Sequence, residues 1–306
     1  MTSVYQPDLA ELILFDAVAR CKSLSAASRE LGVSQQAASA RLRSLERRLG
    51  LVLVTRSHSG AALTQAGTEL LGSVRGVLDA SSRLGQVLAE LQGGGGRSLE
   101  IGASQTIASH LLPGWLLRLR ERQVSRGQGP AETVLRTGNS EDVMRLVREG
   151  AIDVGFIETP FIPQDLGTRV VSRDRLVAVV PAGHAWSDRS DVPLAELAES
   201  SLVVREAGSG TRVAYEEAVR VALGREPVKP VVVLSTEAAV KSAVAGGLGP
   251  AVLSELTVID DVRLGRVRAV PISGADLSRP LTALWRGGER DLFGVARDLV
   301  EVSALA

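Results

Sequence analysis

Cysteine and aromatic residues are scarce in this sequence. Cys21 is the only cysteine among 306 residues, so an intrachain disulfide is impossible and a disulfide-stapled fold is excluded. A lone cysteine is most often a small buried apolar side chain, and we expect this of Cys21. Phe, Trp and Tyr make up 3% of the chain, whereas hydrophobic residues together make up 45%. The sequence therefore predicts a folded protein with a core of Leu, Val, Ile and Ala.

Long apolar runs and the common catalytic motifs are also missing. No run approaches the roughly 20 apolar residues of a membrane-spanning helix, and residues 1–7 lack a basic-then-apolar secretion signal. His58, His110 and His184 lie far apart, without a Cys/His, H-E-x-x-H or G-x-S-x-G motif. We expect a cytoplasmic protein that has no membrane partner, no metal, no cofactor and no catalytic residue.

The formal net charge is zero, which by itself gives no sign of nucleic-acid binding. The charge is uneven, however, because residues 1–66 hold eight Lys and Arg side chains against five Asp and Glu. Between Ser34 and Arg56, five arginines stand against a single acidic residue, Glu46. A local basic stretch of this kind is what contact with DNA phosphates requires.

Length and glycine content divide the chain into three parts. A chain of 306 residues exceeds one ordinary core, and four consecutive glycines at 93–96 cannot continue a helix. We expect an all-α winged helix-turn-helix in residues 1–66, a linker and dimerisation helix with a glycine hinge in 67–96, and an effector-binding domain in 97–306. We expect two lobes in that domain, one from about residues 97–166 with 267–306 and the other from about residues 167–266.

The pattern in residues 8–50 predicts three helices that form a helix-turn-helix. Asp8, Ser25 and Ser34 stand at expected helix N-caps. Glutamine at a helix N-terminus can pair bidentately with adenine, and the Ser34 hydroxyl with the helix dipole suits a phosphate. A three-helix bundle with a solvated polar face is the alternative that the pattern alone leaves open. The polar side of the third helix comprises Gln35, Gln36, Ser39, Arg41 and Arg43.

Residues 68–91 predict one long helix with an apolar stripe. Apolar residues recur at spacings of three and four, which is typical of a coiled coil. A second subunit would cover this stripe in a homodimer, and packing against the chain's own effector domain is the alternative. The stripe comprises Leu71, Val74, Val77, Leu78, Leu84, Leu88 and Leu91.

From residue 97 onward, predicted strands and helices alternate, which indicates an α/β domain with largely parallel sheets. Four strand-to-helix junctions carry hydroxyl or amide side chains at a helix N-terminus, where ligands bind in such sheets. For any single junction, a simple N-cap is the alternative. We expect a small anion or a carboxylate-bearing effector, or an amino acid if Glu158 faces the cleft. The candidate effector residues are Ser104, Gln105, Thr106, Asn139, Ser140, Glu158, Arg205, Ser209, Thr211 and Thr236.

Two stretches, FDAVARCKSLSAASRELGVSQQAASARLRSLERRLG and LVLVTRSHSGAALTQAG, resemble the DNA-binding domain of LysR-type transcription regulators. The resemblance implies that Gln35, Gln36 and Ser39 face the major groove of double-stranded promoter DNA. It implies that Ser34, Arg56 and Thr64 hold the DNA backbone. The wing tip lacks the arginine often found there, which leaves His58 as the candidate for the minor groove. Many relatives also carry proline where Gln36 stands.

The later runs IGASQTIASHLLPGWL, TGNSEDVMRLVREGAIDVGFIE, RLVAVVPAGHAW, LVVREAGSGTR and STEAAVKSAVAGGLG resemble the LysR effector domain, which has the two-lobed fold of periplasmic binding proteins. The family implies a dimer through the linker helix and a homotetramer through the effector domains, with RNA polymerase as a candidate partner. A secreted solute-binding protein would account for residues 97–306 but not for residues 1–92. An enzyme would need a base beside Ser209, and none is evident.

Overall fold

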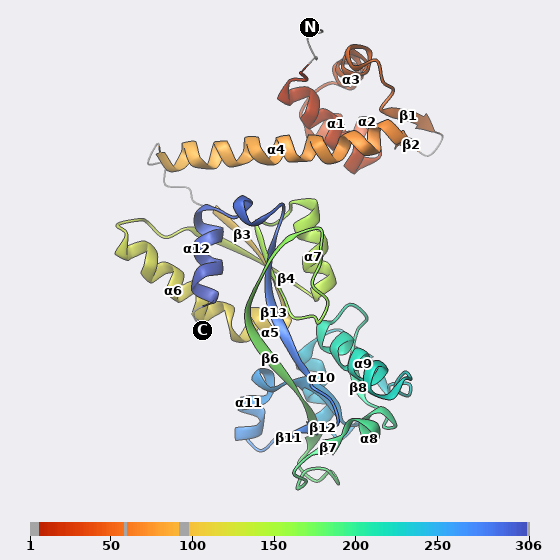
Figure 1. Cartoon of the computed structure of the whole chain (residues 1–306), viewed down its shortest axis with the longest axis vertical. Helices are drawn as coiled ribbons and strands as arrows, with labels where there is room; N and C mark the ends of the chain where they lie inside the picture. The colour runs from red at the N-terminus through yellow and green to blue at the C-terminus, as the bar shows by residue number, and fades with distance from the viewer. Residues whose placement is uncertain (1–5, 58–59, 92–97, 305–306) are drawn as a thin grey trace. The chain divides into compact units, whose positions relative to one another are not determined.

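The computed structural model describes residues 6–57, 60–91 and 98–304 (Figure 1). The chain separates into two compact units, Met1–Gly94 and Gly95–Ala306. No described helix is both long and apolar enough to cross a membrane. The first unit contains α1 (Leu9–Cys21), α2 (Leu24–Glu30), α3 (Gln35–Leu49), β1 (Val54–Ser57), β2 (Gly60–Leu63) and α4 (Gln65–Leu91).

The second unit alternates strands with helices. Its order is β3 (Ser98–Ser104), α5 (Gln105–His110), α6 (Leu112–Ser125), β4 (Glu132–Gly138), α7 (Ser140–Glu149), β5 (Val154–Ile157), β6 (Gly167–Pro181), β7 (Val192–Pro193), α8 (Leu194–Ala198), β8 (Val203–Arg205), α9 (Gly210–Leu223), β9 (Val232–Leu234), α10 (Glu237–Ala245), β10 (Ala251–Ser254), α11 (Glu255–Arg263), β11 (Val267–Val270), β12 (Ile272–Ser273), β13 (Ser278–Trp285) and α12 (Gly294–Ser303), with a 3-10 helix at Glu289–Asp291 before α12.

The helix starts of the first unit follow from local capping. Asp8 and Glu11 form a reciprocal capping box, because the Glu11 amide donates to Asp8 Oδ1 at 2.8 Å and the Asp8 amide donates to Glu11 Oε2 at 3.2 Å. The predicted cap of α2 at Ser25 is wrong. Ser23 caps this helix, because its extended backbone lets its hydroxyl accept from the Ala26 amide at 3.3 Å. Ser25 therefore lies inside the first turn.

The core of the first unit holds α1, α2 and α3 against the start of α4. Phe15, Ala27 and Ala38 are fully buried where these helices meet. Leu71 and Leu78, from the predicted stripe of α4, pack partly buried against the same core. The beginning of the stripe is therefore covered within the chain's own unit.

The main sheet of the second unit has nine strands, eight of them in the order β4-β3-β5-β13-β6-β10-β8-β9, with β11 also paired to β6. The sets β4-β3-β5 and β10-β8-β9 are parallel internally, as expected for α/β alternation. By contrast, β6 and β13 are antiparallel to each other and to their other partners in this sheet. Figure 1 shows these two long strands running side by side through both halves of the unit.

The two lobes have separate cores on either side of these long strands. In the first lobe, α6 and α12 pack on one face of the sheet and α7 packs on the other. In the second lobe, α8 and α9 cover one face and α10 and α11 the other. These layers bury the apolar faces of both half-sheets.

The boundaries between the lobes differ from those expected at residues 167 and 267. Residues 167–174 of β6 pair with β13 in the first lobe, and β6 pairs with β10 only from Leu176 onward. Val267 and Val270 of β11 pack in second-lobe cores. The chain therefore crosses between the lobes near Asp174 and again near Arg279, which are direct neighbours across β6 and β13.

Candidate DNA-binding surface and effector site

The N-terminus of α3 presents the side chains expected to read DNA. The Ser34 hydroxyl accepts from the Ala37 amide at 3.2 Å and so fixes the start of the helix. Gln35 and Gln36, in the first turn, are exposed. Ser39, one turn further along, is half-buried. Gln35 and Gln36 are thus accessible at the end of the helix where the dipole is positive.

Further along α3, Arg41 and Arg43 are exposed, whereas Leu42 between them is buried. This alternation gives the helix a basic outer side over an apolar inner one. At the far end, Gly50 adopts the left-handed conformation with φ of 66° and ends the helix. The exposed arginines suit phosphate contacts beside the glutamines.

The wing is a two-stranded antiparallel hairpin in which Arg56 pairs with Ala61. His58 lies outside the described residues, and the structure gives the position of Arg56 in the strand but not of its side chain. Thr64 has a defined local role, because its hydroxyl donates to the Val52 carbonyl at 2.7 Å and accepts from the Gly67 amide at 3.0 Å. Thr64 thereby ties the wing to the start of α4, and its contact with DNA stays a prediction.

Cys21 is half-buried, and its sulfur lies 3.2 Å from Glu30 Oε2. Desolvation and the neighbouring Glu30 carboxylate raise the pKa of the Cys21 thiol. Arg20 forms an ion pair with Glu30 and helps to lower the pKa of that carboxyl. The thiol is therefore kept in its less reactive protonated form.

In the second unit, the structure brings α5 of the first lobe against α10 of the second. Gln105 Nε2 donates to the Ser235 carbonyl at 3.2 Å, and the Glu237 amide donates to Gln105 Oε1 at 3.0 Å. Thr106 Oγ1 lies 3.5 Å from Glu237 Oε2, and His110 Nε2 lies 3.5 Å from Glu237 Oε1. Glu237 was missed at the sequence level because it follows Thr236 as an ordinary acidic residue in a first helical turn.

A second contact between the lobes joins α7 to the loop before α9. A Cβ at Gly208 would lie 3.3 Å from the amide of Asn139, and one at Gly210 would lie 2.9 Å from Ser140 Oγ. The Ser140 hydroxyl also accepts from the Glu158 amide at 3.3 Å. Glycine is required at this close approach, because a side chain at residue 210 would overlap the Glu158 carbonyl oxygen.

The four predicted junctions serve two different purposes. Asn139 and Thr236 are N-caps, since their side chains accept from amides of the first turns of α7 and α10. Ser104 and Ser209 occupy N-cap positions but form no side-chain cap. Both serines are at most 2% exposed. The side chains at two of the junctions therefore act as simple helix N-caps, whereas those at the other two do not.

Arg279 is the central charged residue between the lobes, and sequence reasoning missed it. Its side chain is fully buried. Its Nε and Nη2 donate to Asp174 Oδ2 at 2.9 and 2.7 Å, and Nη2 also donates to Glu158 Oε2 at 3.2 Å. Its Nη1 donates to the Glu158 carbonyl and to Thr211 Oγ1, both at 3.0 Å. The available signal was an arginine beside the apolar run of a strand, in SRPLTALW.

The carboxyl groups that bind Arg279 are buried. Burial raises the pKa of Glu158, and this effect exceeds the opposing influence of Arg279 and of the Thr106 hydroxyl. The negative charges of Asp174 and Glu237 push the pKa in the same upward direction. Glu158, at the end of β5, thus faces the region between the lobes. This is the condition under which the sequence predicts an amino acid as the effector.

Arg205 is buried, but Nε and Nη2 donate to the Glu206 carboxylate, both at 2.9 Å. Arg212 next to it donates to Glu216 at 2.6 Å and to the Arg205 carbonyl at 3.2 Å. Arg205 and Arg212, which flank the loop at residues 208–210, are therefore both paired within the second lobe. Among the described residues, no three His, Cys, Asp or Glu side chains are grouped as metal ligands.

Comparison with curated proteins gives relatives along almost the whole chain. An HTH-type transcriptional regulator of Mycobacterium tuberculosis is 42% identical over 297 residues, covering 96% of this chain and 95% of the relative. The regulator CbbR of Rhodospirillum rubrum is 30% identical over 293 residues, covering 95% and 94%.

Solved structures share the fold. A full-length OxyR variant from Pseudomonas aeruginosa matches with a TM-score of 0.70 at 23% identity, covering 99% of this chain and 96% of OxyR. Full-length CbnR in complex with its target DNA matches with a TM-score of 0.52 at 22% identity, covering 97% and 100%. The regulatory domain of Synechocystis CcmR in complex with 2-PG matches with a TM-score of 0.59 at 21% identity, covering 68% and 96%.

Two family models cover the chain in the order that the two units require. Residues 9–68 match the bacterial regulatory helix-turn-helix protein, lysR family, and residues 92–302 match the LysR substrate binding domain. The second model alone covers more than half of the chain. The members of this family bind promoter DNA and small-molecule effectors and are not enzymes. The chain belongs to the LysR family of DNA-binding transcription regulators.

Proposed function

We propose that this regulator reads a specific promoter sequence through α3 and the β1–β2 wing and responds to an effector held between the two lobes. The observation that carries the proposal is the exposure of Gln35 and Gln36 directly after the Ser34 cap. Amide side chains in that position can reach base edges, while the basic side of α3 contacts phosphates. A DNA-binding regulator acts where the chromosome is, so we place the protein in the cytoplasm.

Footprinting of the purified full chain on DNA upstream of its own coding sequence tests this function. We expect two protected half-sites separated by about one helical turn, or a multiple of it, on the same face of the DNA. A shuffled DNA of the same length and base composition is the control at the same salt concentration. Equal affinity for both DNAs would contradict sequence-specific regulation.

For the effector we propose a small anion or a carboxylate-bearing metabolite. The support is the pair of N-termini of α7 and α9, whose free amides and dipoles suit an anion, together with the buried hydroxyls of Ser104 and Ser209. Thr106→Val removes a hydroxyl at nearly constant volume. We expect loss of the effector response with DNA binding intact. Undiminished effector affinity in the double variant Ser104→Ala/Thr106→Val, measured by calorimetry, would place the effector elsewhere.

We propose that the protein is a dimer through α4. Val77, Leu84 and Leu88 of the stripe are 48%, 59% and 46% exposed. A second copy of α4 would cover them. Leu84→Glu with Leu88→Glu should yield monomers in sedimentation and leave the core of the first unit intact, unlike changes at Leu71 and Leu78. A wild-type monomer at micromolar concentration would contradict this proposal.

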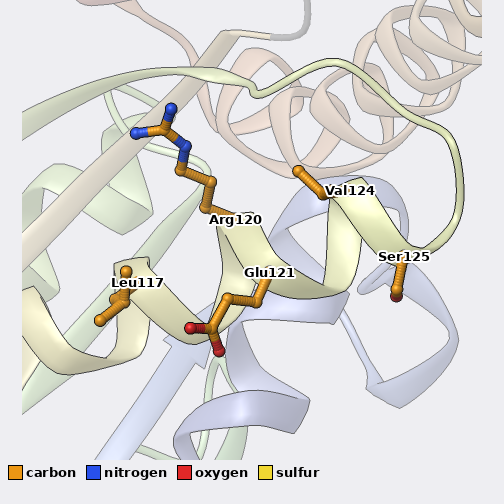
Figure 2. Close-up of a pocket in the computed structure, with 5 residues that line it drawn as sticks. All are labelled: Leu117, Arg120, Glu121, Val124 and Ser125. Carbon is orange, nitrogen blue, oxygen red and sulfur yellow. The ribbon is translucent and has the colours of Figure 1, made fainter.

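A homotetramer needs a second contact, for which we propose the outer side of α6. Figure 2 shows the groove there, lined by Leu117, Arg120, Glu121, Val124 and Ser125. Leu117 and Val124 are 59% and 64% exposed, and the adjacent opposite charges could pair with a second copy. Leu117→Asp should convert tetramers to dimers.

RNA polymerase is a further proposed partner, which pull-down with the DNA-bound regulator would test.

A further inference from the structure

Ser104 contains a buried polar atom that no described group satisfies. The residue is 1% exposed, and its Oγ has no hydrogen-bond partner among the described residues. A buried hydroxyl without a partner is destabilising, because the hydrogen bonds it loses with water are not replaced. A ligand that hydrogen-bonds Ser104 would remove this cost.

The Ser104 hydroxyl lies on the α7 face of the sheet. Ser104 of β3 is paired in parallel register with Gly138 of β4, so that both residues point to the same face. A Cβ at Gly138 would lie 2.8 Å from Cβ of Asp142, in the first turn of α7. The unsatisfied hydroxyl therefore faces the N-terminal end of α7.

The N-terminus of α9 adds to this position from the other lobe. Gly210, its first residue, approaches Ser140 Oγ, as described above, and Ser209 beside it forms no side-chain cap. The start of α9, a helix of 14 residues, thus meets the start of α7, a helix of 10 residues, at Ser140. The positive dipole ends of both helices lie at this contact, where α7 also carries Glu141 and Asp142 and where Asn139 already caps the Asp142 amide. This end of the site can hold a single carboxylate.

The arginines near this site have no capacity left for a second negative charge. Each guanidinium nitrogen of Arg279 already donates to Asp174, Glu158 or Thr211. Arg205 is held by Glu206 in the second lobe. Charge neutralisation of a multiply charged anion would require one of these buried pairs to break, which leaves a carboxylate unpaired.

The other end of the site has surplus negative charge. The Thr106 hydroxyl lies between Glu158 and Glu237 and has one proton to donate to them. Glu158 shares Arg279 with Asp174, and Glu237 has His110 at 3.5 Å. Burial raises the pKa of Glu158, and the negative charges of Asp174 and Glu237 act in the same direction.

We propose that the effector is a zwitterion of the amino-acid class. Its carboxylate is held by Ser104 and the N-termini of α7 and α9, and its ammonium group by Glu158 and Glu237 around Thr106. This inference rests on the proposed effector site between the lobes and names its ligand class. The ammonium group donates hydrogen bonds to the carboxylates of Glu158 and Glu237. It supplies positive charge there, since Arg279 is shared between Glu158 and Asp174 and has no bond to Glu237. Since α5 and α10 contact each other through Gln105, the ligand enters when the lobes part.

A matched ligand series tests the charge requirement with the full-length protein. The probes are the standard L-amino acids, the 2-hydroxy acid corresponding to each, and 2-phosphoglycerate as a multiply charged anion. Binding is measured by calorimetry at neutral pH. We expect at least one amino acid to bind and its 2-hydroxy acid, which lacks the ammonium, to bind at least about tenfold more weakly, equivalent to about 1.4 kcal/mol. We expect 2-phosphoglycerate not to bind.

Variants assign the effect to the two ends of the site. Glu237→Gln and Glu158→Gln should reduce the preference for the amino acid over its hydroxy acid, whereas Ser104→Ala should weaken both ligands. Glu255→Gln is the matched control, because Glu255 forms an exposed ion pair with Arg175. It should change neither the affinity for the two ligands nor the preference between them. If Glu158→Gln fails to fold, the ligand preference of Glu237→Gln still tests the proposal, because Glu237 is less buried than Glu158.

The possible failures are distinguishable. A hydroxy acid or 2-phosphoglycerate that binds as tightly as any amino acid, and is weakened by Ser104→Ala, overturns the zwitterion but keeps the site. An unchanged preference in Glu237→Gln also overturns the zwitterion. An amino acid whose affinity is unaffected by Ser104→Ala and Glu237→Gln overturns the proposed site. Absence of binding by every amino acid overturns the inference, while footprinting still tests the DNA-binding function on its own.

Discussion

The two units place their functional polar groups in opposite environments. In the first unit, Gln35, Gln36 and Arg43 are exposed on a helix whose start is already fixed by Ser34. In the second, Glu158 and Arg279 are buried and bonded to each other where the chain crosses between the lobes. A surface that contacts a large charged polymer can be preformed and open to water. The buried polar groups between the lobes are instead bonded mainly to one another, with the Ser104 hydroxyl as an exception.

The buried side of this comparison predicts the largest effect. Arg279→Met keeps the length of the side chain but leaves Glu158 and Asp174 without their counter-charge. Loss of one partner of a buried charge pair destabilises a protein by about 3–5 kcal/mol. We expect this loss in urea unfolding followed by tryptophan fluorescence, because all three tryptophans lie in the second unit.

Arg175→Met is the matched control for this loss. Arg175 lies on β6 beside Asp174, but its ion pair with Glu255 is exposed. Exposed pairs contribute about 0–1 kcal/mol. Equal destabilisation by the two substitutions would show that the buried cluster is no more important than a surface pair.

The exposed side of the comparison predicts a change in specificity with no loss of stability. Gln35→Ala removes an exposed side chain in the first turn of α3 and should cost about 1–3 kcal/mol on the specific site. Arg56→Ala should weaken binding to specific and random DNA alike. Fluorescence anisotropy with both DNAs at one salt concentration measures the ratio. An unchanged specific-to-random ratio in Gln35→Ala would exclude its role in base reading.

Local sequence signals predicted the exposed surface better than the buried one. The bounds of α3 follow from Ser34 and Gly50, since capping and periodicity act over a few residues. The strand-to-helix junctions at Ser104, Asn139 and Ser209 were found for the same reason. The assignment of Ser25 as a cap was wrong because two serines compete within three positions, and the backbone at Ser23 decides between them.

The Arg279 cluster could not be predicted in this way. Its bonds to Asp174 and Glu158 join residues separated by 105 and 121 positions. They exist because β13 pairs with β6 in one particular register, which brings Arg279 opposite Asp174. A single sequence contains no signal for that register. For the same reason, the strand pairing puts the crossings between the lobes near Asp174 and Arg279 and not near residues 167 and 267, because β6 and β13 each continue across both lobes.

Glu158 in the second unit and Glu30 in the first should contribute to stability with opposite pH dependence. The pKa of Glu158 is raised above its usual 4.5, mainly by burial. Below its usual pKa, the carboxyl is protonated in the folded and in the unfolded chain, and its contribution to the free energy of unfolding is fully present. As pH rises, the unfolded chain releases the proton first, and the contribution is lost as pH passes through the folded pKa. Glu30 in the first unit has a lowered pKa, so its contribution is lost instead as pH falls.

Urea unfolding followed by tryptophan fluorescence between about pH 4.5 and pH 8 tests the Glu158 titration. Arg279, Asp174, Thr106 and Glu237 surround this carboxyl and remain in place in Glu158→Gln. We expect this variant to gain stability relative to the wild type as pH rises. A constant difference across the range would mean that the carboxyl keeps its usual pKa in the folded protein.

The smallest expected effect concerns the start of α2, within the exposed unit. Ser23→Ala removes the hydroxyl that accepts from the Ala26 amide and should cost about 1 kcal/mol. Ser25→Ala should be neutral or slightly stabilising, because Ser25 lies within the helix and alanine has the higher helix propensity. Hydrogen exchange of α2 peptides in the full chain measures both variants, and a cost of about 1 kcal/mol corresponds to roughly fivefold faster exchange. Faster exchange in Ser25→Ala than in Ser23→Ala would restore Ser25 as the cap.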